Sequence, residues 1–249
     1  GRTNHPPGFL LSCWPCRDDF CPATDYAVGM DDVTRKQDRV PDFGADFRAQ
    51  LLELFRWRRD VRKFRRDPLP AGALERLLSV ASLAPSVGLS EPWRFVIVDS
   101  EGNRQSIRAC FERTNNEALR GYSGERAALY ARLKLEGLSD APCQLAVFAD
   151  PATPQGHGLG RMTMPMTIEY LAVAAVNLIW LAARAEGIGM GWVSILDPAE
   201  VKGALDVPTE WTLIGYFCLG YPLAESDTPT LETDGWECRA KSGSTVLRR

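Results

Sequence analysis

Residues 168–196 read IEYLAVAAVNLIWLAARAEGIGMGWVSIL, an apolar run followed by a glycine-rich turn and a second apolar run. The first part, residues 168–185, is apolar on nearly every face, which predicts a helix in the core or at a dimer interface. Asn177 interrupts this run, and its uncharged length is shorter than a bilayer span, so we expect no membrane segment. Gly187 is placed to end the helix, and residues 187–191 let the backbone turn into a strand that begins at Trp192.

Outside this stretch, the composition of several segments predicts further buried strands. Together with the strand after the glycines, they are residues 93–98, 144–149, 192–196 and 213–219. Amphipathic spacing predicts helices over residues 46–59 and 74–81. Buried strands that alternate with helices predict an α/β sheet. The charged segment 102–137 is long enough to fold over a site as a lid, and its alternative interpretation is a solvated helical face.

Composition limits the class of protein. The chain has 249 residues, 45% of them hydrophobic, which suits one large domain better than two equal ones. Its formal net charge is −3 and its pI is about 5.6. A protein that binds nucleic acid usually presents a basic surface throughout, so we expect no nucleic-acid partner. The seven cysteines are odd in number and mostly scattered singly, a pattern typical of reduced thiols in a cytoplasmic protein.

The N-terminal residues lack a core pattern. Residues 1–40 contain Pro, Gly and Asp without periodicity, so we expect a disordered extension upstream of a start at Met30. Within it, Cys13 and Cys16 have the spacing of a redox or zinc half-site, but no second pair completes a ligand set. We therefore expect the domain itself to occupy residues 41–222.

A basic cluster contrasts with the acidic balance of the whole chain. Residues 56–66 read RWRRDVRKFRR and place seven cations in eleven residues. Read as a helix, Arg58 and Arg62 lie four residues apart on one face, where two guanidinium groups can bind one phosphate. The cluster therefore predicts a site for a small anionic ligand. Asp60, inside the cluster, could react beside that ligand or simply pair with Arg58 or Arg62.

Side chains for hydrolytic or metal chemistry are scarce. His5 and His157 are the two histidines of the chain, and neither GxSxG nor GxxxxGK[ST] occurs. The glycines of residues 187–191 follow a helix and open a strand, which is the reverse of the dinucleotide-binding fingerprint. A bound organic cofactor would supply the chemistry that the side chains lack.

Three separated segments resemble the FMN-binding nitroreductase superfamily in sequence and in order. They are residues 58–64 (RRDVRKF), 84–95 (APSVGLSEPWRF) and 187–194 (GIGMGWVS), within a similarity that covers roughly residues 45–222. Typical nitroreductases carry Ser where Asp60 stands and Asn where Gly88 stands. Asp60, together with residues 123–126 (SGER), 133–137 (LKLEG) and 191–194 (GWVS), is similar to the BluB branch, the 5,6-dimethylbenzimidazole synthases.

The resemblance implies an α+β fold, an FMN-dependent nitroreductase-like sandwich with a central mixed sheet flanked by helices. It also implies a domain-swapped homodimer that is joined through residues 168–185, with residues 223–249 as an arm on the partner subunit. In this branch reduced FMN is the substrate and O2 the co-substrate. The flavin is fragmented to 5,6-dimethylbenzimidazole, the lower ligand of vitamin B12, and erythrose 4-phosphate. A separate flavin reductase supplies the reduced FMN.

Individual roles follow from the same resemblance. Asp60 is expected to act as the general base that takes a proton from the ribityl carbon next to the ring. Ser194, which as a plain strand hydroxyl would have no role, is expected to hydrogen-bond the flavin. The expected flavin-binding residues are Arg58, Arg59, Asp60, Val61, Arg62, Pro85, Ser86, Gly88, Lys134 and Ser194. We expect no metal.

Two other functions stay open at this point. An NAD(P)H-dependent nitroreductase or flavin reductase would keep FMN intact and pass hydride to an electrophile, and Asp60 and Gly88 argue against it. A non-catalytic protein that binds flavin or nucleic acid would use the arginines only to neutralise phosphate.

Overall fold

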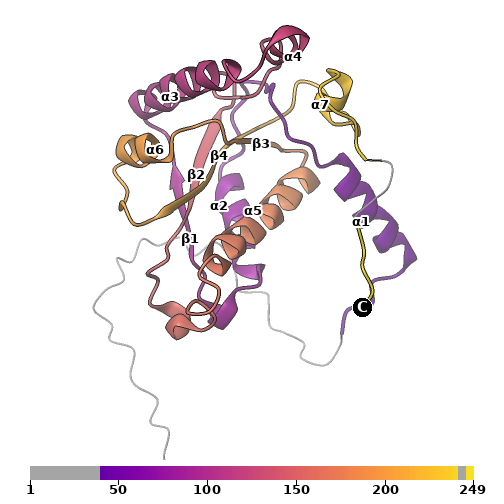
Figure 1. The fold of residues 1–249 in the computed structure, drawn as a ribbon. Coiled ribbons are helices and arrows are strands. Elements are labelled where there is room, and N and C mark those ends of the chain that lie inside the picture. Colours follow the sequence, from indigo (N-terminus) through magenta and orange to yellow (C-terminus); the bar gives the residue numbers. More distant parts are fainter. Residues whose placement is uncertain (1–39, 241–244) are drawn as a thin grey trace, which may run out of the picture. The chain divides into compact units, whose positions relative to one another are not determined.

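The computed structural model describes residues 40–240 and 245–249. From Gly44 onward, the described residues form one compact unit (Figure 1). Of the predicted N-terminal extension, residues 1–39 lie outside the described residues, and with them Cys13, Cys16 and Met30.

Four strands form one antiparallel sheet in the order β1-β2-β4-β3. They are β1 (Trp93–Ile97), β2 (Cys143–Ala149), β3 (Gly189–Val193) and β4 (Thr212–Gly220). The expected α+β fold with a sheet flanked by helices is confirmed, and so are the four predicted strands, of which the third is shifted to Gly189–Val193. The expected α/β or mixed directions of the strands are wrong, because each pair of neighbouring strands is antiparallel. Within the described ranges, the one parallel pairing is an isolated bridge between Asp60 and Met190.

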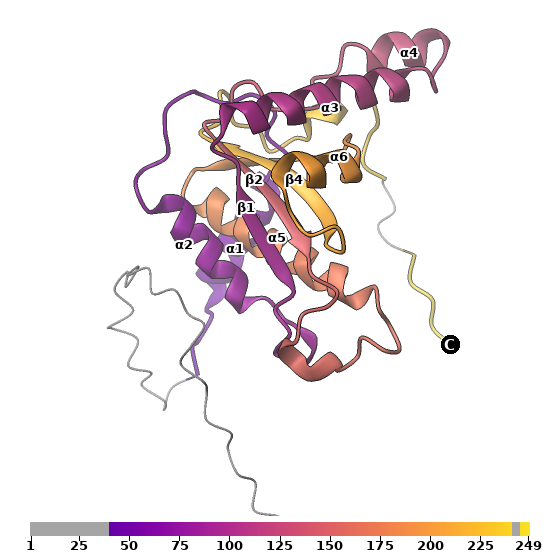
Figure 2. The same ribbon diagram turned by 90° about the vertical axis from the view of Figure 1, so that its left-hand side faces the viewer.

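The connections explain why neighbouring strands are antiparallel. Between β1 and β2 the chain runs out along α3 (Glu101–Leu119), turns into α4 (Gly124–Tyr130), and returns to the end of the sheet that it left (Figures 1 and 2). A parallel neighbour would need a crossover along the sheet instead. The crossover through α5 (Thr167–Ala185) joins β2 to β3, and β4 lies between these two strands.

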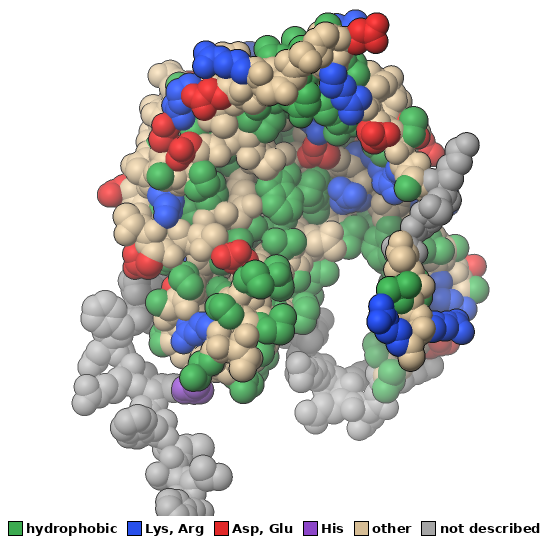
Figure 3. All heavy atoms as spheres, in the orientation of Figure 1, with side chains coloured by type: hydrophobic (Ala, Val, Ile, Leu, Met, Phe, Trp, Pro, Cys, Tyr) green, Lys and Arg blue, Asp and Glu red, His purple; other side chains and the backbone are tan. Residues whose placement is uncertain are grey.

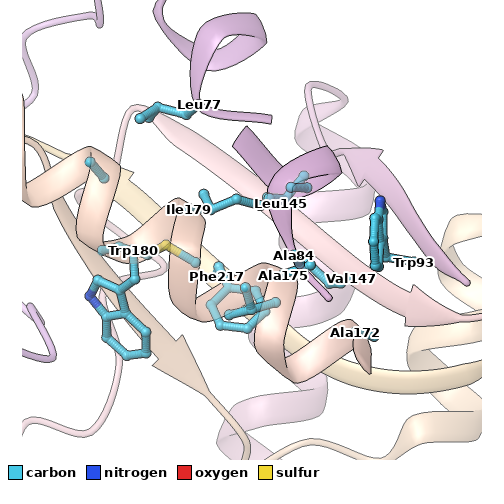
Figure 4. Packing of buried hydrophobic residues seen from close by; sticks show 14 of the residues in the cluster. Leu77, Ala84, Trp93, Leu145, Val147, Ala172, Ala175, Ile179, Trp180 and Phe217 are labelled. Carbon is cyan, nitrogen blue, oxygen red and sulfur yellow. The ribbon is translucent and has the colours of Figure 1, made fainter. Parts of the chain in front are cut away.

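Helix α5 packs on one face of the sheet and supplies much of the core (Figure 4). Its Ile179 and Trp180 share a buried cluster with Leu145, Val147 and Phe217 of the sheet. By length and composition it is the one helix of the described part that could cross a membrane, a criterion that core helices also meet. The prediction of a core helix is confirmed by its buried residues, which are Ile168, Ala172, Ala175, Val176, Ile179, Trp180 and Ala183.

The other helices are shorter than α3 and α5. They are α1 (Ala45–Trp57), α2 (Ala73–Ser79), α6 (Pro198–Leu205) and α7 (Thr230–Thr233), with 3-10 turns η1 (Val80–Leu83), η2 (Val87–Leu89) and η3 (Gln155–Gly158). The predicted helix 74–81 is confirmed as α2 followed by η1. The charged segment 102–137 is largely helical, as α3 and α4, and its role as a lid stays a prediction.

The predicted helix 46–59 ends earlier than expected, and this changes the geometry of the basic cluster. Arg58 is extended, with φ −68° and ψ 113°, so α1 stops before it. The interpretation of Arg58 and Arg62 as neighbours on one helical face is therefore wrong. The backbone leaves the helix because it pairs with the sheet instead: the Val61 N–H donates to the Met190 carbonyl at 3.1 Å.

Candidate functional site

Strand β3 is built to let another segment lie directly on its edge. A Cβ on Gly191 would lie 2.0 Å from the Val61 carbonyl oxygen, and one on Gly189 would lie 2.8 Å from Val61 Cγ2. Only glycine leaves room for such a close approach. The predicted strand 192–196 is accordingly shifted, because the glycines belong to β3 itself and Ser194 follows it.

The Asp60 carboxylate joins the extended segment to this strand. Its Oδ1 accepts a hydrogen bond from the Trp192 N–H at 2.8 Å, and its Oδ2 accepts one from Arg62 Nε at 2.9 Å. A second guanidinium nitrogen of Arg62 lies 2.9 Å from Oδ2. The Asp60 side chain remains 31% exposed. The interpretation of Asp60 as an ion-pair partner of Arg62 is thus confirmed, and three donors hold the carboxylate in one orientation.

A cavity of about 480 Å³ opens beside Asp60. Its volume lies in the range of small-molecule sites. Figure 3 shows a hollow below the upper helices, with basic and acidic side chains around it. The residues that line the cavity are Trp57, Arg59, Asp60, Val61, Arg62, Lys63, Leu129, Arg132, Leu133, Lys134, Trp180, Arg184, Ile188, Gly189, Met190, Leu223, Ala224, Glu225, Ser226, Thr228, Thr230 and Asp234.

Basic side chains outnumber acidic ones around this cavity. Arg184 pairs with Glu225 at 2.5 Å, and Lys134 pairs with Glu136 at 2.5 Å. Such an excess of cations on a concave surface favours an anionic ligand. The basic residues are Arg59, Arg62, Lys63, Arg132, Lys134 and Arg184, and the acidic ones are Asp60, Glu225 and Asp234.

Arg59 is the cation best suited to an incoming anion. Its Nε is buried and has no hydrogen-bond partner among the residues that the structure describes. Burial, and then the positive charges of Arg239 and Arg58, lower the pKa of Arg59 from its ordinary value. Arg59 and Arg239 also line a second hollow of about 500 Å³ beside Phe55. A phosphate bound here would satisfy the buried donor and offset the crowding of like charges.

The structure brings together half of the predicted flavin-binding residues. Those that line the cavity are Arg59, Asp60, Val61, Arg62 and Lys134. Arg58 lies beside them, with its guanidinium 4.8 Å from the centre of the Trp180 ring. Ser194 and the loop that carries Pro85, Ser86 and Gly88 do not line the cavity. The loop lies at the other end of α5 from α4 and α7 (Figures 1 and 2), where a Cβ on Gly88 would lie 2.8 Å from the Gly156 carbonyl oxygen.

Sequence reasoning missed much of the cavity wall. Trp57, Trp180 and Arg184 lie in the stretches quoted above but were not predicted as site residues, and tertiary packing brings Trp180 and Arg184 beside Asp60. Residues 223–234 line the cavity of their own chain, whereas the sequence suggested only an arm for a partner. The charged composition of residues 102–137 was the available signal for the wall that contains Leu133 and Lys134.

The arrangement can bind a phosphorylated aromatic ligand and hold a carboxylate beside it. The indoles of Trp57 and Trp180 offer apolar surface, while Arg59 offers an unsatisfied donor for phosphate. Asp60 has lone pairs beyond the three donors that it already accepts, so it can still take a proton. These are the demands that FMN makes of a site. Within residues 40–240 and 245–249, no group of three His, Cys, Asp or Glu side chains could hold a metal ion.

Comparison with known proteins agrees with this chemistry. The Nitroreductase family profile matches residues 55–221. A 5,6-dimethylbenzimidazole synthase from Rhodospirillum rubrum is 55% identical over 199 residues, which are 80% of this chain and 94% of that protein. A protein of the same name from Rhodobacter capsulatus is 44% identical over 196 residues, which are 79% of this chain and 95% of that protein.

Solved structures share the fold. The structure of oxidised iodotyrosine deiodinase with FMN and 3-iodo-L-tyrosine matches with a TM-score of 0.61 and 25% identity, over 80% of this chain and 97% of that one. A nitroreductase from Exiguobacterium sibiricum in complex with FMN matches with a TM-score of 0.54 at 16% identity, over 74% of this chain and 90% of that one. The chain belongs to the nitroreductase family and, within it, to the family of the 5,6-dimethylbenzimidazole synthases.

Proposed function

We propose that the protein converts reduced FMN and O2 to 5,6-dimethylbenzimidazole and erythrose 4-phosphate. The observation that carries the proposal is the Asp60 carboxylate, which is held at the wall of a cation-rich cavity. The resemblance described in the sequence analysis implies serine at this position in nitroreductases that preserve their flavin. The identity of 42–55% to relatives named as this synthase supports the same activity.

The cations have the role of holding the flavin by its phosphate and ribityl chain. Arg58 and Arg59 would bind the phosphate, and the buried Nε of Arg59, which has no hydrogen-bond partner among the described residues, supports this role for Arg59. Arg62, Lys134 and the backbone at Val61 would bind the ribityl oxygens and the ring edge, a role supported by their position in the cavity wall. Binding energy gained far from the reacting ring is thereby used for orientation.

Asp60 has the role of general base. Reduced FMN supplies a ring that reacts with O2, so the chain itself need only orient the flavin, exclude water and move protons. The carboxylate would take a proton from the ribityl carbon next to the ring. Its bonds to Trp192 and Arg62 fix its direction, which is what a base must have before a proton can move.

Pro85, Ser86, Gly88 and Ser194 would complete the site in a homodimer. The loop with Pro85 and Ser86 lies away from the cavity of its own chain, so we assign it to the flavin of the partner subunit. The outer face of α5 carries exposed apolar side chains, with Tyr170 54% and Val173 39% exposed. These side chains support the proposal that a second copy of the chain covers this face. We propose a domain-swapped dimer in which residues 223–249 also contact the partner, while Ser194 hydrogen-bonds the ring.

Reduced FMN must come from another protein in this proposal. A separate flavin reductase is its proposed source, as the resemblance to the synthase branch implies. We place the reaction in the cytoplasm, in keeping with the free thiols of the described cysteines, Cys110, Cys143, Cys218 and Cys238.

Chromatography of the products tests the proposal. The protein is mixed with chemically reduced FMN, air is admitted, and the products are separated. A benzimidazole peak is the expected result. If the flavin is recovered intact, and NAD(P)H is consumed with a nitroaromatic, the protein is a reductase and the proposal is wrong. Intact flavin without either reaction would indicate a flavin-binding protein.

The variant Asp60→Asn tests the role of the base in the same assay. The amide cannot take up the proton, so benzimidazole formation should fall by at least about 100-fold, the usual contribution of general base catalysis. FMN binding, followed by quenching of flavin fluorescence, should stay within about threefold of the parent because the cations remain. If FMN binding and benzimidazole formation are both lost, Asp60 has only a structural role and the assignment as general base is wrong.

A further inference from the structure

Arg62 is held differently from the other cations of the cavity. Its side chain is only 15% exposed. Two of its nitrogens bind the Asp60 carboxylate, and its Nη1 donates to the Lys134 carbonyl at 3.1 Å. The planar guanidinium group of Arg62 therefore joins Asp60 to the segment around Lys134, which lies 72 residues after Arg62 in the sequence.

That segment, residues 131–138, is named here the wall segment. Its C-terminal end is anchored by Leu138, which is buried. The Glu136 carboxylate accepts from Lys134 Nζ and from the Leu138 N–H, so both bonds stay inside the segment. The Leu133 N–H donates to the Tyr130 carbonyl, which is also local. Among the hydrogen bonds of the described residues, the bond from Arg62 is the one that joins the cavity-lining residues Leu133 and Lys134 to the strand edge that carries Asp60.

We propose that Arg62 is a positioning residue that fixes the wall segment and the Asp60 carboxylate in one mutual geometry. This inference rests on the proposed function, in which Asp60 is the base and the wall segment faces the flavin. Arg62 acts through its two partners: the base cannot turn without loosening the wall, and the wall cannot shift without turning the base. Orientation within a fraction of an ångström is what such a network contributes to a reaction.

The chemistry requires arginine. A guanidinium group presents five donors in a rigid plane, so it can bind a carboxylate on one edge and a carbonyl on another. A lysine at position 62 would keep the positive charge beside Asp60. Its single ammonium on a flexible stem would not hold both partners in a fixed relation. Arg62→Lys therefore separates the charge of Arg62 from its bridging geometry.

Hydrogen–deuterium exchange of the full-length protein without flavin is the first test. In Arg62→Lys, amides of the wall segment should exchange at least about fivefold faster than in the parent, while those of β2 stay unchanged. Asp60→Asn should have the same effect, although Asp60 makes no hydrogen bond to that segment. The matched control is Arg65→Lys, because the Arg65 side chain is 54% exposed, pairs with Asp67 and does not line the cavity. Unchanged exchange of the wall segment in Arg62→Lys would overturn the proposal.

Turnover is the second test. Arg62→Lys should lower kcat for benzimidazole formation by about tenfold or more and leave KM and FMN affinity within about threefold, because the charge is retained. The double variant with Asp60→Asn should be no slower than Asp60→Asn alone, since both changes break one unit. A rise in KM with normal kcat would mean that Arg62 only binds flavin, and would overturn the proposal. If the parent makes no benzimidazole, the proposed function is wrong. The exchange test still shows whether Arg62 holds Asp60 and the wall segment together.

Discussion

At the scale of single residues, the site depends on what surrounds Asp60 as much as on Asp60 itself. The carboxylate can bond to the Trp192 N–H because Gly191 leaves the edge of β3 open. Arg62 then donates to the other carboxylate oxygen, so the remaining lone pairs of the carboxylate point in fixed directions. A serine at position 60 would be too short and uncharged to bridge the strand and the guanidinium group in this way.

Gly191→Ala is the residue-scale prediction. The added methyl group would lie 2.0 Å from the Val61 carbonyl oxygen, so the segment with Asp60 must move off the strand. We expect the free energy of unfolding to fall by about 2–3 kcal/mol and benzimidazole formation to be lost. Urea unfolding and product chromatography measure the two effects. Gly203→Ala is the matched control, since a Cβ there meets nothing within 4 Å in helix α6, and it should be neutral or slightly stabilising.

At the scale of elements, α4 and the segment after α7 both lie beside the cavity and contact each other. Trp236 follows α7, and the guanidinium group of Arg126, in α4, lies 4.0 Å from the centre of its ring. Arg126 also donates to the Trp236 carbonyl at 3.0 Å. The rings of Tyr122 and Tyr130 meet Trp236 edge-on, at 5.6 and 6.0 Å. Leu129, next to Tyr130, and Asp234, near Trp236, line the cavity.

Trp236→Ala is the element-scale prediction. Loss of the cation–π and edge contacts should weaken the attachment of α4 by about 1–2 kcal/mol. FMN affinity should fall about threefold to tenfold, because the walls at Leu129 and Asp234 are no longer held together. Fluorescence titration with FMN measures this. Trp236→Phe keeps a ring in place and should recover most of the affinity. Equal affinity of the alanine variant and the parent would show that α4 and the segment after α7 are independent.

At the scale of the whole molecule, the predicted site residues occupy two distant places in one chain. The cations and Asp60 lie beside β3, while the loop with Ser86 lies at the other end of α5 (Figures 1 and 2). In α1, which buries none of its residues, Leu52 is 62% and Phe55 45% exposed. A symmetric dimer would cover such surfaces and could bring the Ser86 loop of each subunit to the cavity of its partner.

Val173→Glu tests this assembly. The parent should elute with a mass of about twice 27.6 kDa in light scattering. A charge on the outer face of α5 cannot be buried unpaired, so the variant should be monomeric and should bind FMN at least about tenfold more weakly. Ser106→Glu, on the exposed side of α3, is the matched control and should remain dimeric. A monomeric parent that still binds FMN would contradict the dimer.

The thiols of Cys143, which is partly buried, and of Cys218, which is buried, are expected to make the stability of the protein depend on alkaline pH. Burial raises the pKa of Cys143 from 9.0 to about 11, and it also raises those of Cys218 and Tyr216. The folded state then holds protons that the unfolded state has released, so the free energy of unfolding falls as pH rises from about 9 to 11. Each such group contributes up to about 1.4 kcal/mol per pH unit. In urea titrations under reducing conditions, Cys143→Ala should flatten this slope, and an identical slope would refute the assignment.

How far the sequence could predict the fold and the site depends on the range of the interactions. The apolar run of α5, the four strands and the order of the motifs are local patterns, and they sufficed to indicate the secondary structure and the family. The strand directions were wrong, because they depend on the return path through α3 and α4. The end of α1 was wrong as well, because the pairing of Val61 with Met190 outweighs helix propensity at Arg58.

The sequence by itself determined which residues are candidates for the site: the arginines, Asp60 and the glycines before Trp192 are all recognisable from their order along the chain. Tertiary structure alone decided how they meet. Arg62 turned out to bridge Asp60 and Lys134, and Ser86 and Ser194 lie away from the cavity of their own chain. The physical reason is that residue type follows from local sequence, whereas a contact across 72 residues exists only after the core has packed.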